Sequence, residues 1–220
     1  MQHEEVKNLI LVEKLVVLFR RVPLEQMAEV SKALVRGGVK LLEVTFDQQA
    51  EDPAVLYARS LEIVREAVGE KLCLGAGTVL TPQQVRAAKA AGAEFILSPN
   101  TDSQVISLTR ELGMVSVPGA MTPSEIVAAW NSGADIVKLF PADDLGCHYI
   151  WNLRGPLPHI PLLATGGVNP RTIPEFLKYG VNAVGTGVSI VDRKLLEAED
   201  YAGIEALARA HVDAVAQFRK

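Results

Sequence analysis

The 220-residue sequence predicts an α/β protein folded as a single (β/α)8 (TIM) barrel. Apolar runs rich in β-branched residues recur eight times, and each is followed by a helix or helical turn. Strict alternation of strand and helix is typical of parallel strands joined by crossover helices. The competing fold, an open doubly wound sheet, usually carries a glycine fingerprint after its first strand. Here the first strand ends in Phe-Arg-Arg-Val-Pro instead.

The expected strands are the runs in which Val, Ile, Leu and Phe gather, because these side chains suit a covered, pleated surface. The strands are expected at Leu15–Arg20, Leu41–Phe46, Cys73–Val79, Phe95–Asn100, Met114–Ala120, Ile136–Ala142, Pro161–Val168 and Ala183–Ile190.

The expected helices lie between these strands and end at glycines. The segment Pro23–Arg36 places apolar residues on one face and stops at Gly37-Gly38, and Ala54–Val68 stops at Gly69. Three later helices are expected to begin with an N-cap residue and a first-turn proline. These pairs are Thr81-Pro82, Thr122-Pro123 and Asn169-Pro170.

No linker-like or low-complexity stretch divides the chain, so we expect one domain over residues 1–220. A short helical segment is expected at about residues 1–14, before the first strand. Barrels of this length are commonly single domains.

The composition is that of an ordinary folded protein, with 49% hydrophobic and 22% charged residues and a net charge of −4. This charge predicts no nucleic-acid partner and no membrane surface. The two cysteines, Cys73 and Cys147, form no CxxC pair or disulfide framework, so we expect a reducing cytoplasm. The four histidines have no metal-site spacing, and His3, His159 and His211 are expected to be surface or packing residues.

Two ionisable residues lie inside expected strands. Lys138 interrupts the apolar run Ile136–Ala142, and Glu43 interrupts Leu41–Phe46. The outer face of a barrel strand packs on apolar helices, which is the worse place for a charge, so we expect both side chains to point inward. There they would approach each other from opposite sides of the barrel.

This pair predicts Schiff-base chemistry. A lysine surrounded by apolar groups has its charged form disfavoured, and the neutral amine can attack a ketone. A buried carboxylic acid can then carry protons to and from the substrate. A structural ion pair between the two residues is the alternative interpretation.

Several motifs then resemble the 2-keto-3-deoxy-6-phosphogluconate (KDPG) and 4-hydroxy-2-oxoglutarate (KHG) aldolase family. They are GGVKLLEVT, LGAGTVLTPQQV, AGAEFILSPN, IVKLFPA and ATGGV, in that order over nearly the whole chain. The resemblance implies a (β/α)8 barrel, usually a homotrimer, that needs no metal or other cofactor. It implies cleavage of a 2-keto-3-deoxy-6-phospho sugar acid or of 4-hydroxy-2-oxoglutarate to pyruvate and an aldehyde or aldehyde phosphate.

The resemblance also implies roles for individual residues. Lys138 corresponds to the Schiff-base lysine and Glu43 to the general acid/base. Thr78, Pro99, Phe140 and Thr165 correspond to residues at the pyruvate end, and Gly166-Gly167 to a loop that holds phosphate through backbone N–H groups.

Two positions depart from the family pattern. Asp47 stands where many members carry an arginine for the substrate carboxylate, and Arg20 is expected to take over that role. Many members read Gly-x-Gly-Ser near the last strand, with the serine touching phosphate. This chain has Gly185-Thr186-Gly187-Val188-Ser189 there, so the hydroxyl is displaced or absent.

Three functions stay open at this point. An aldolase for a phosphorylated or unphosphorylated keto acid is favoured. A sugar-phosphate isomerase or decarboxylase with the same barrel, and a non-catalytic barrel that binds a sugar acid, are the alternatives.

Overall fold

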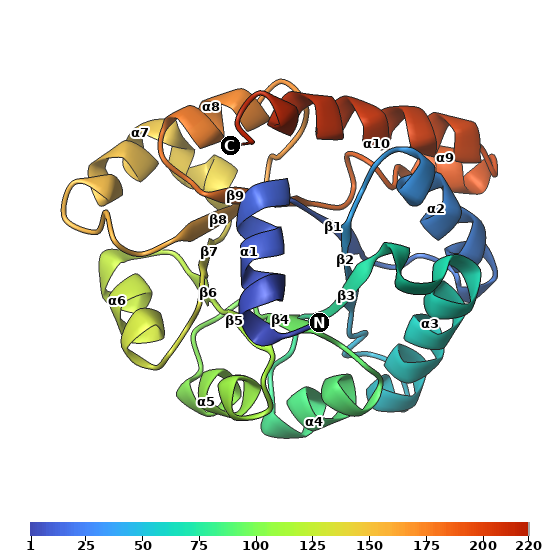
Figure 1. Cartoon of the computed structure of the whole chain (residues 1–220), viewed down its shortest axis with the longest axis horizontal. Coiled ribbons are helices and arrows are strands. Elements are labelled where there is room, and N and C mark those ends of the chain that lie inside the picture. The colour runs from blue at the N-terminus through green and yellow to red at the C-terminus, as the bar shows by residue number, and fades with distance from the viewer. Residues whose placement is uncertain (220) are drawn as a thin grey trace.

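The computed structural model describes residues 1–219 as an α/β fold in which parallel strands form one nearly closed barrel (Figure 1). Nine strands lie in this part of the chain, in the order β5-β4-β3-β2-β1-β9-β8-β7-β6. Helices surround the sheet on its outer side. The fold class expected from the strand–helix alternation is therefore confirmed at the level of a parallel α/β barrel.

The strands are shorter than expected, because the residues after each last ladder pair turn away into loops. Their bounds are β1 Leu15–Phe19, β2 Leu41–Thr45, β3 Cys73–Gly77, β4 Phe95–Leu97, β5 Val115–Val117, β6 Gly119–Ala120, β7 Val137–Leu139, β8 Leu162–Thr165 and β9 Ala183–Thr186. The expected strand Met114–Ala120 contains both β5 and β6, separated by Pro118.

The helices also follow the sequence pattern closely. Their bounds are α1 His3–Glu13, α2 Leu24–Arg36, α3 Pro53–Val68, α4 Pro82–Ala90, α5 Ser103–Glu111, α6 Pro123–Asn131, α7 Ala142–Arg154, α8 Ile173–Lys178, α9 Arg193–Glu197 and α10 Tyr201–Ala216, with a 3-10 turn η1 at Gly69–Lys71. Thr81 and Thr122 cap α4 and α6 with their side chains, as expected.

The expected start of the eighth helix at Asn169-Pro170 is wrong. Asn169 Oδ1 accepts hydrogen bonds from the N–H groups of Arg171 (3.0 Å) and Thr172 (3.3 Å), which closes a turn. Helix α8 therefore begins only at Ile173. The same Asx chemistry that caps helices also stabilises turns, so the pattern alone does not separate the two outcomes.

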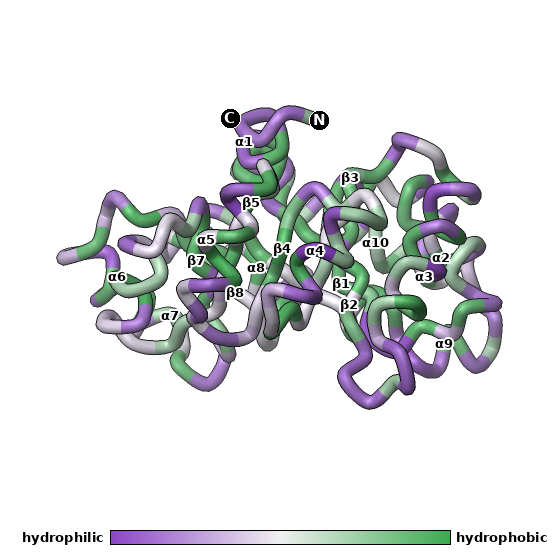
Figure 2. Tube along the Cα trace, turned by 90° about the horizontal axis from the view of Figure 1, so that it is seen from below, coloured by the Kyte–Doolittle hydropathy of each residue, from purple (hydrophilic) through white to green (hydrophobic). Residues whose placement is uncertain are grey.

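Hydrophobic residues are concentrated along the strands (Figure 2) and form two clusters. The larger cluster lies between sheet and helices. The interior cluster fills the barrel with side chains from alternate strand positions, among them Val16, Leu41, Phe95, Ile136 and Leu163.

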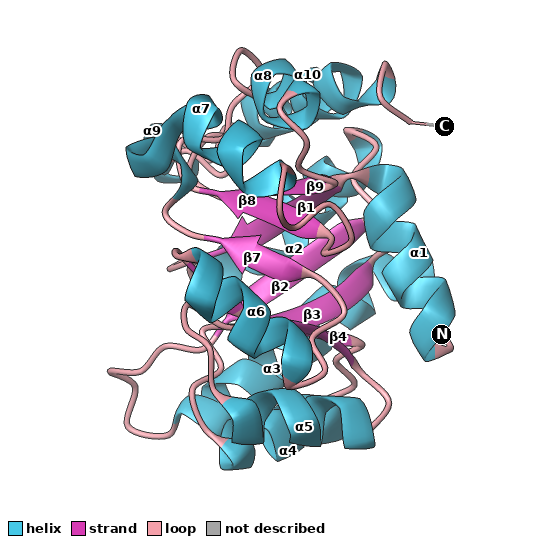
Figure 3. Ribbon diagram, turned by 90° about the vertical axis from the view of Figure 1, so that its left-hand side faces the viewer, coloured by secondary structure: helices cyan, strands magenta, loops and turns pink. Residues whose placement is uncertain are grey.

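Helix α1 covers the amino-terminal end of the strands (Figure 3). Its buried residues Val6 and Ile10 belong to the interior cluster, together with the first residues of several strands. The helix therefore closes one end of the barrel with apolar side chains, and only the carboxyl ends of the strands are left for a site.

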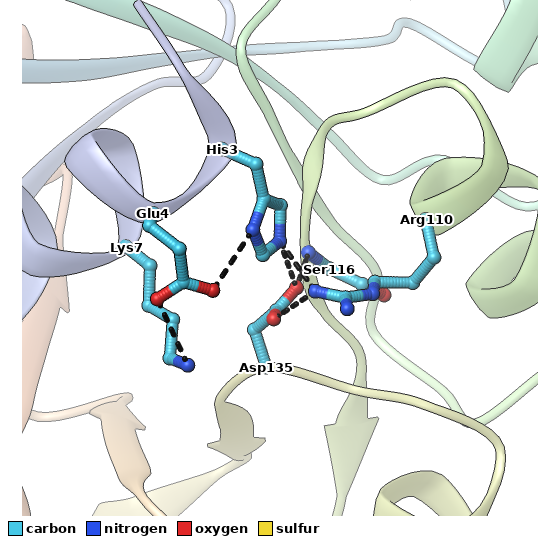
Figure 4. A network of polar contacts seen from close by, with 6 residues as sticks. All are labelled: His3, Glu4, Lys7, Arg110, Ser116 and Asp135. Carbon is cyan, nitrogen blue, oxygen red and sulfur yellow. Dashed lines mark hydrogen bonds and ion pairs between the residues drawn. The ribbon is translucent and has the colours of Figure 1, made fainter.

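A polar network fastens α1 to this end (Figure 4). Asp135, which is 5% exposed, accepts a hydrogen bond from the N–H of Ser116 at 2.9 Å. It also forms an ion pair with Arg110, and His3 Nε2 lies 3.1 Å from its Oδ2. One buried carboxylate thus joins β5, α5 and α1.

Among residues 1–219, no helix has both the length and the apolar character needed to cross a membrane.

We expect Asp135→Ala to lower the free energy of unfolding by about 2 kcal/mol, because it leaves the Ser116 N–H and Arg110 without their carboxylate. Chemical denaturation measures this loss. Glu4→Ala is the control, since the Glu4 side chain is exposed where it pairs with His3 and Lys7, and the substitution should change stability by less than about 0.5 kcal/mol. Equal losses in the two variants would contradict the buried role of Asp135.

Candidate active site

Glu43 on β2 and Lys138 on β7 both project into the barrel. Side chains alternate along a strand, so Glu43 shares the side of Leu41 and Lys138 the side of Ile136, and both of these partners belong to the interior cluster. Glu43 is 3% exposed and Lys138 is 6% exposed. The inward placement expected from the sequence is therefore what the structure shows.

A glycine makes room for the Glu43 carboxyl group. A Cβ atom at Gly77 on β3 would lie 1.6 Å from Glu43 Oε1, so any larger residue there would displace the carboxyl group. The Thr45 hydroxyl donates a hydrogen bond of 2.6 Å to the same oxygen. Burial raises the pKa of Glu43, while the Thr45 hydrogen bond and the charges of Lys138 and Arg20 oppose that shift. The protonated acid is thus more available than on an ordinary glutamate.

Burial also shifts the pKa of Lys138. It lowers the pKa of the ammonium group to about 8, with the Glu43 charge opposing the shift and the Arg20 charge adding to it. About one lysine in ten is then neutral at pH 7. The Nζ atom lies 4.7 Å from the centre of the Phe140 ring. Within residues 1–219 no hydrogen bond or ion pair caps this nitrogen, which argues against the structural ion pair with Glu43.

Two cavities of about 410 and 360 Å³ open at the carboxyl ends of the strands and share Arg20 and Phe140. Those two residues therefore stand between the cavities. The first cavity contains, among others, Thr45, Asp47, Tyr57, Thr78 and Pro99, and the second contains Thr165, Gly166, Gly167, Gly187, Val188 and Ser189. The substrate-binding residues proposed from the sequence therefore line these two cavities, whereas the buried Glu43 and Lys138 are not among the lining residues.

Two buried hydroxyl groups in these cavities have no hydrogen-bond partner among the described residues: Thr165 Oγ1 in the second cavity and the Tyr57 hydroxyl in the first. A buried hydroxyl without a partner is costly unless a ligand or water satisfies it. Tyr57 was missed from the sequence, since it lies on the buried face of α3 and its ring stacks on Phe46 at 4.3 Å.

The first cavity also contains a strained backbone position. Thr78 has φ +54°, in the left-handed region that residues with a side chain rarely adopt. Gln48 Nε2 donates a hydrogen bond of 2.8 Å to the Thr78 carbonyl, and Gln84 Nε2 donates one of 2.8 Å to Gln48 Oε1. Nothing in the sequence pattern links these two glutamines to Thr78, because Gln48 lies in the loop after β2 and Gln84 in the first turn of α4.

The second cavity offers backbone donors. Gly166 and Gly167 have φ +107° and +65°, and the N–H groups of Gly166, Gly167, Val188 and Ser189 donate no hydrogen bond to another described residue. Such a group of N–H donors can hold an anion. Asp143 lies directly against the two glycines, since a Cβ at Gly166 would be 2.7 Å from its Oδ1.

Ser189 reaches the second cavity, but its hydroxyl faces protein groups. Its Oγ lies 2.6 Å from Thr186 Oγ1, 2.8 Å from the Val168 carbonyl oxygen and 2.9 Å from His211 Nε2. Val188, the preceding residue, is 80% exposed. His211, expected to be a surface or packing residue, is buried and hydrogen-bonded.

Both the sequence and the fold of this chain match known proteins. The family model described as KDPG and KHG aldolase matches residues 6–207. The chain is 33% identical over 192 residues to the KHG/KDPG aldolase of Escherichia coli K12, covering 86% of both chains. It is also 33% identical over 166 residues to the 2-dehydro-3-deoxy-6-phosphogalactonate aldolase of the same strain, covering 75% of this chain and 78% of that one.

Two solved structures are similar over most of the chain. One is a native KDPGal structure, with a TM-score of 0.81 and 28% identity over 92% of this chain and 94% of that one. The other is the KDPG aldolase of Legionella pneumophila with pyruvate captured as a covalent carbinolamine. Its TM-score is 0.82, with 26% identity over 93% of this chain and 96% of that one.

We expect the Lys138 ammonium to titrate near pH 8, and two substitutions should move this midpoint in opposite directions. Arg20→Ala removes a positive charge that lowers the pKa and should raise the midpoint, whereas Glu43→Gln removes a charge that raises the pKa and should lower it. NMR titration of protein labelled with 13C at the lysine ε-carbon measures both, with Lys138→Met identifying the signal. Shifts of the same sign in both variants would contradict the arrangement of these charges.

Proposed function

The chain belongs to the KDPG and KHG aldolase family, and we propose that Lys138 is its Schiff-base nucleophile and Glu43 its general acid/base. The observation that carries this proposal is a buried lysine with a pKa of about 8 and no capping partner among the described residues, together with a buried glutamate whose charge acts on it. Both side chains point into the barrel. The proposed reaction is cleavage of a 4-hydroxy-2-oxo acid into pyruvate and an aldehyde.

The chemistry begins with attack of the neutral Lys138 Nζ on the C2 carbonyl carbon. Protonated Glu43 gives its proton to the hydroxyl of the resulting carbinolamine, which leaves as water, so that a protonated imine and the Glu43 carboxylate remain. Glu43, as the carboxylate, takes the proton of the C4 hydroxyl while the C3–C4 bond breaks, and the electron pair of that bond moves toward the iminium nitrogen. The aldehyde leaves, Glu43 returns the proton to C3 of the enamine, and water releases pyruvate and the free amine.

Binding roles follow from the two cavities. We assign Thr78, Pro99 and Phe140 to the pyruvyl end. We assign Thr165 Oγ1, which has no hydrogen-bond partner among the described residues, to a substrate oxygen. Arg20, which borders both cavities, is assigned to the substrate carboxylate, because Asp47 is an acid.

The preferred substrates are 2-dehydro-3-deoxy-6-phosphogluconate, which would release glyceraldehyde 3-phosphate, and 4-hydroxy-2-oxoglutarate, which would release glyoxylate. The unpartnered N–H groups of Gly166, Gly167, Val188 and Ser189 support an anionic group in the second cavity. Gly187 is assigned to the same loop.

An unphosphorylated 2-keto-3-deoxy sugar acid is the second candidate. Three features favour it. The side chain of Val188 is apolar and exposed, the hydroxyl of Ser189 contacts protein groups and does not face the cavity, and the carboxylate of Asp143 lies beside the glycine loop. Comparing kcat/KM for the phosphorylated and unphosphorylated acids decides between the two substrates.

We further infer that the barrel has the eight-stranded (β/α)8 form, with β5 and β6 as two halves of one strand. In support, only Pro118 separates them, β5 pairs with β4, and β6 pairs with β7. A homotrimer in the cytoplasm is proposed from the family. The oligomer is supported by a cage designed by fusing symmetric oligomeric domains, which is 27% identical to this chain with a TM-score of 0.81. The reducing compartment is supported by the free thiols of Cys73 and Cys147.

Lys138→Ala should abolish both pyruvate release and the covalent adduct that borohydride traps with pyruvate, because only an imine at this amine is reducible. Mass spectrometry locates the adduct, and coupled pyruvate detection follows turnover. Lys40→Ala, an exposed lysine before β2, is the matched control and should behave as wild type. Glu43→Gln should slow turnover at least about a hundredfold while the adduct stays detectable. Trapping that survives in Lys138→Ala would identify another nucleophile.

Arg20→Ala should raise the KM for the keto acid about tenfold or more, because the substrate carboxylate loses its cationic partner. Steady-state kinetics with pyruvate release measures the effect. Arg21→Ala is the neighbouring control, and a KM that rises only in that variant would move the role to Arg21.

A further inference from the structure

The buried histidine on α10 is not used by the proposed chemistry, yet it contacts the loop that forms the second cavity. His211 is 0% exposed, and its Nε2 lies 2.9 Å from Ser189 Oγ. Its Nδ1 lies 2.7 Å from the carbonyl oxygen of Leu207, one turn earlier in the same helix. Both ring nitrogens are thus hydrogen-bonded, as is usual for a buried polar side chain, and one of these bonds reaches the loop that lines the second cavity.

The hydrogen-bond roles can be assigned from the partners. A carbonyl oxygen only accepts, so His211 Nδ1 carries the proton and donates to Leu207. Burial lowers the pKa of His211, so the ring is neutral and Nε2 is an acceptor. The one hydroxyl proton of Ser189 is then shared between His211 Nε2 at 2.9 Å and the Val168 carbonyl oxygen at 2.8 Å. Thr186 Oγ1, 2.9 Å from the Val168 carbonyl oxygen, donates there.

This network ties together the two walls of the second cavity. Val168 follows the Gly166-Gly167 loop after β8, whereas Ser189 lies in the turn after β9, where the N–H groups of Ile190 and Val191 bond to the Gly187 carbonyl. Ser189 Oγ lies 2.8 Å from Val168 O, so one hydroxyl contacts both walls. The imidazole of α10 holds that hydroxyl from behind.

We infer that His211 is a positioning residue for the anion-binding loop of the second cavity. By accepting the Ser189 hydroxyl proton, it fixes the turn in which the free N–H groups of Val188 and Ser189 face the cavity. The group bound there is a phosphate or similar oxyanion of the substrate's aldehyde half, and the inference rests in that respect on the proposed function. Ser189 accordingly acts through its backbone N–H, not through its hydroxyl.

The test compares two substitutions of the same residue. His211→Leu keeps an apolar side chain of similar volume without an acceptor, whereas His211→Gln keeps an acceptor oxygen near the Nε2 position. His159→Leu, at an exposed histidine, is the control. KM and kcat are measured with the 6-phosphorylated and the unphosphorylated keto acid, the pyruvate adduct is trapped with borohydride, and thermal unfolding confirms that each variant is folded.

In His211→Leu we expect KM for the phosphorylated acid to rise about five- to tenfold, with kcat, the unphosphorylated acid and pyruvate trapping changed by less than about twofold. His211→Gln should restore most of that KM. Ser189→Ala should raise this KM at least as much as His211→Leu, because it removes the Val168 contact as well as the His211 contact, and the double variant should be no worse than Ser189→Ala.

Equal effects on both substrates, or an unchanged KM for the phosphorylated acid in folded His211→Leu, would overturn the positioning role. If wild type neither traps pyruvate nor cleaves either acid, the proposed function fails separately. Titration with inorganic phosphate, followed by 31P NMR, then still tests the inference. Weaker binding in His211→Leu than in wild type supports it, and equal binding or no binding in both overturns it.

Discussion

The desolvated amine of Lys138 is the feature on which the rest of the structure depends. An ammonium group in an apolar barrel is costly, and the cost is reduced when the proton leaves. That is why the pKa falls to about 8 and part of the Lys138 side chain is present as the neutral amine near neutral pH. A partner within ion-pairing distance would cancel the effect, and the barrel instead keeps Glu43 and Arg20 close enough to tune the charge without capping it.

Other parts of the fold make that environment possible. Helix α1 seals the amino-terminal end of the barrel with Val6 and Ile10, and the Phe95 ring occupies space that a side chain at Gly75 would need. The missing side chain of Gly77 likewise leaves room for the Glu43 carboxyl group. Packing at one end and the space left by a glycine further along thus divide the barrel interior into an apolar half and a half that holds the ionisable side chains of Glu43 and Lys138.

Much of this could be predicted from residue order alone. The alternation of apolar runs and capped helices indicates a parallel α/β barrel, and Lys138 and Glu43 are recognisable because charged residues inside such runs need a reason. Strand ends were less accurate, as in the division of Met114–Ala120 at Pro118. Asn169-Pro170 showed the limit of cap patterns, since the same side chain closes a turn instead of starting a helix.

The sequence by itself determined the fold class, the two ionisable residues inside strands and the family motifs, because periodicity and local chemistry are written in neighbouring positions. Only the tertiary structure decided which groups meet across elements. Tyr57 from α3, Gln48 from the loop after β2 and His211 from α10 reach the site through packing between segments distant in the chain. The direction of the Ser189 hydroxyl was decided in the same way, since it depends on an imidazole 22 residues further along.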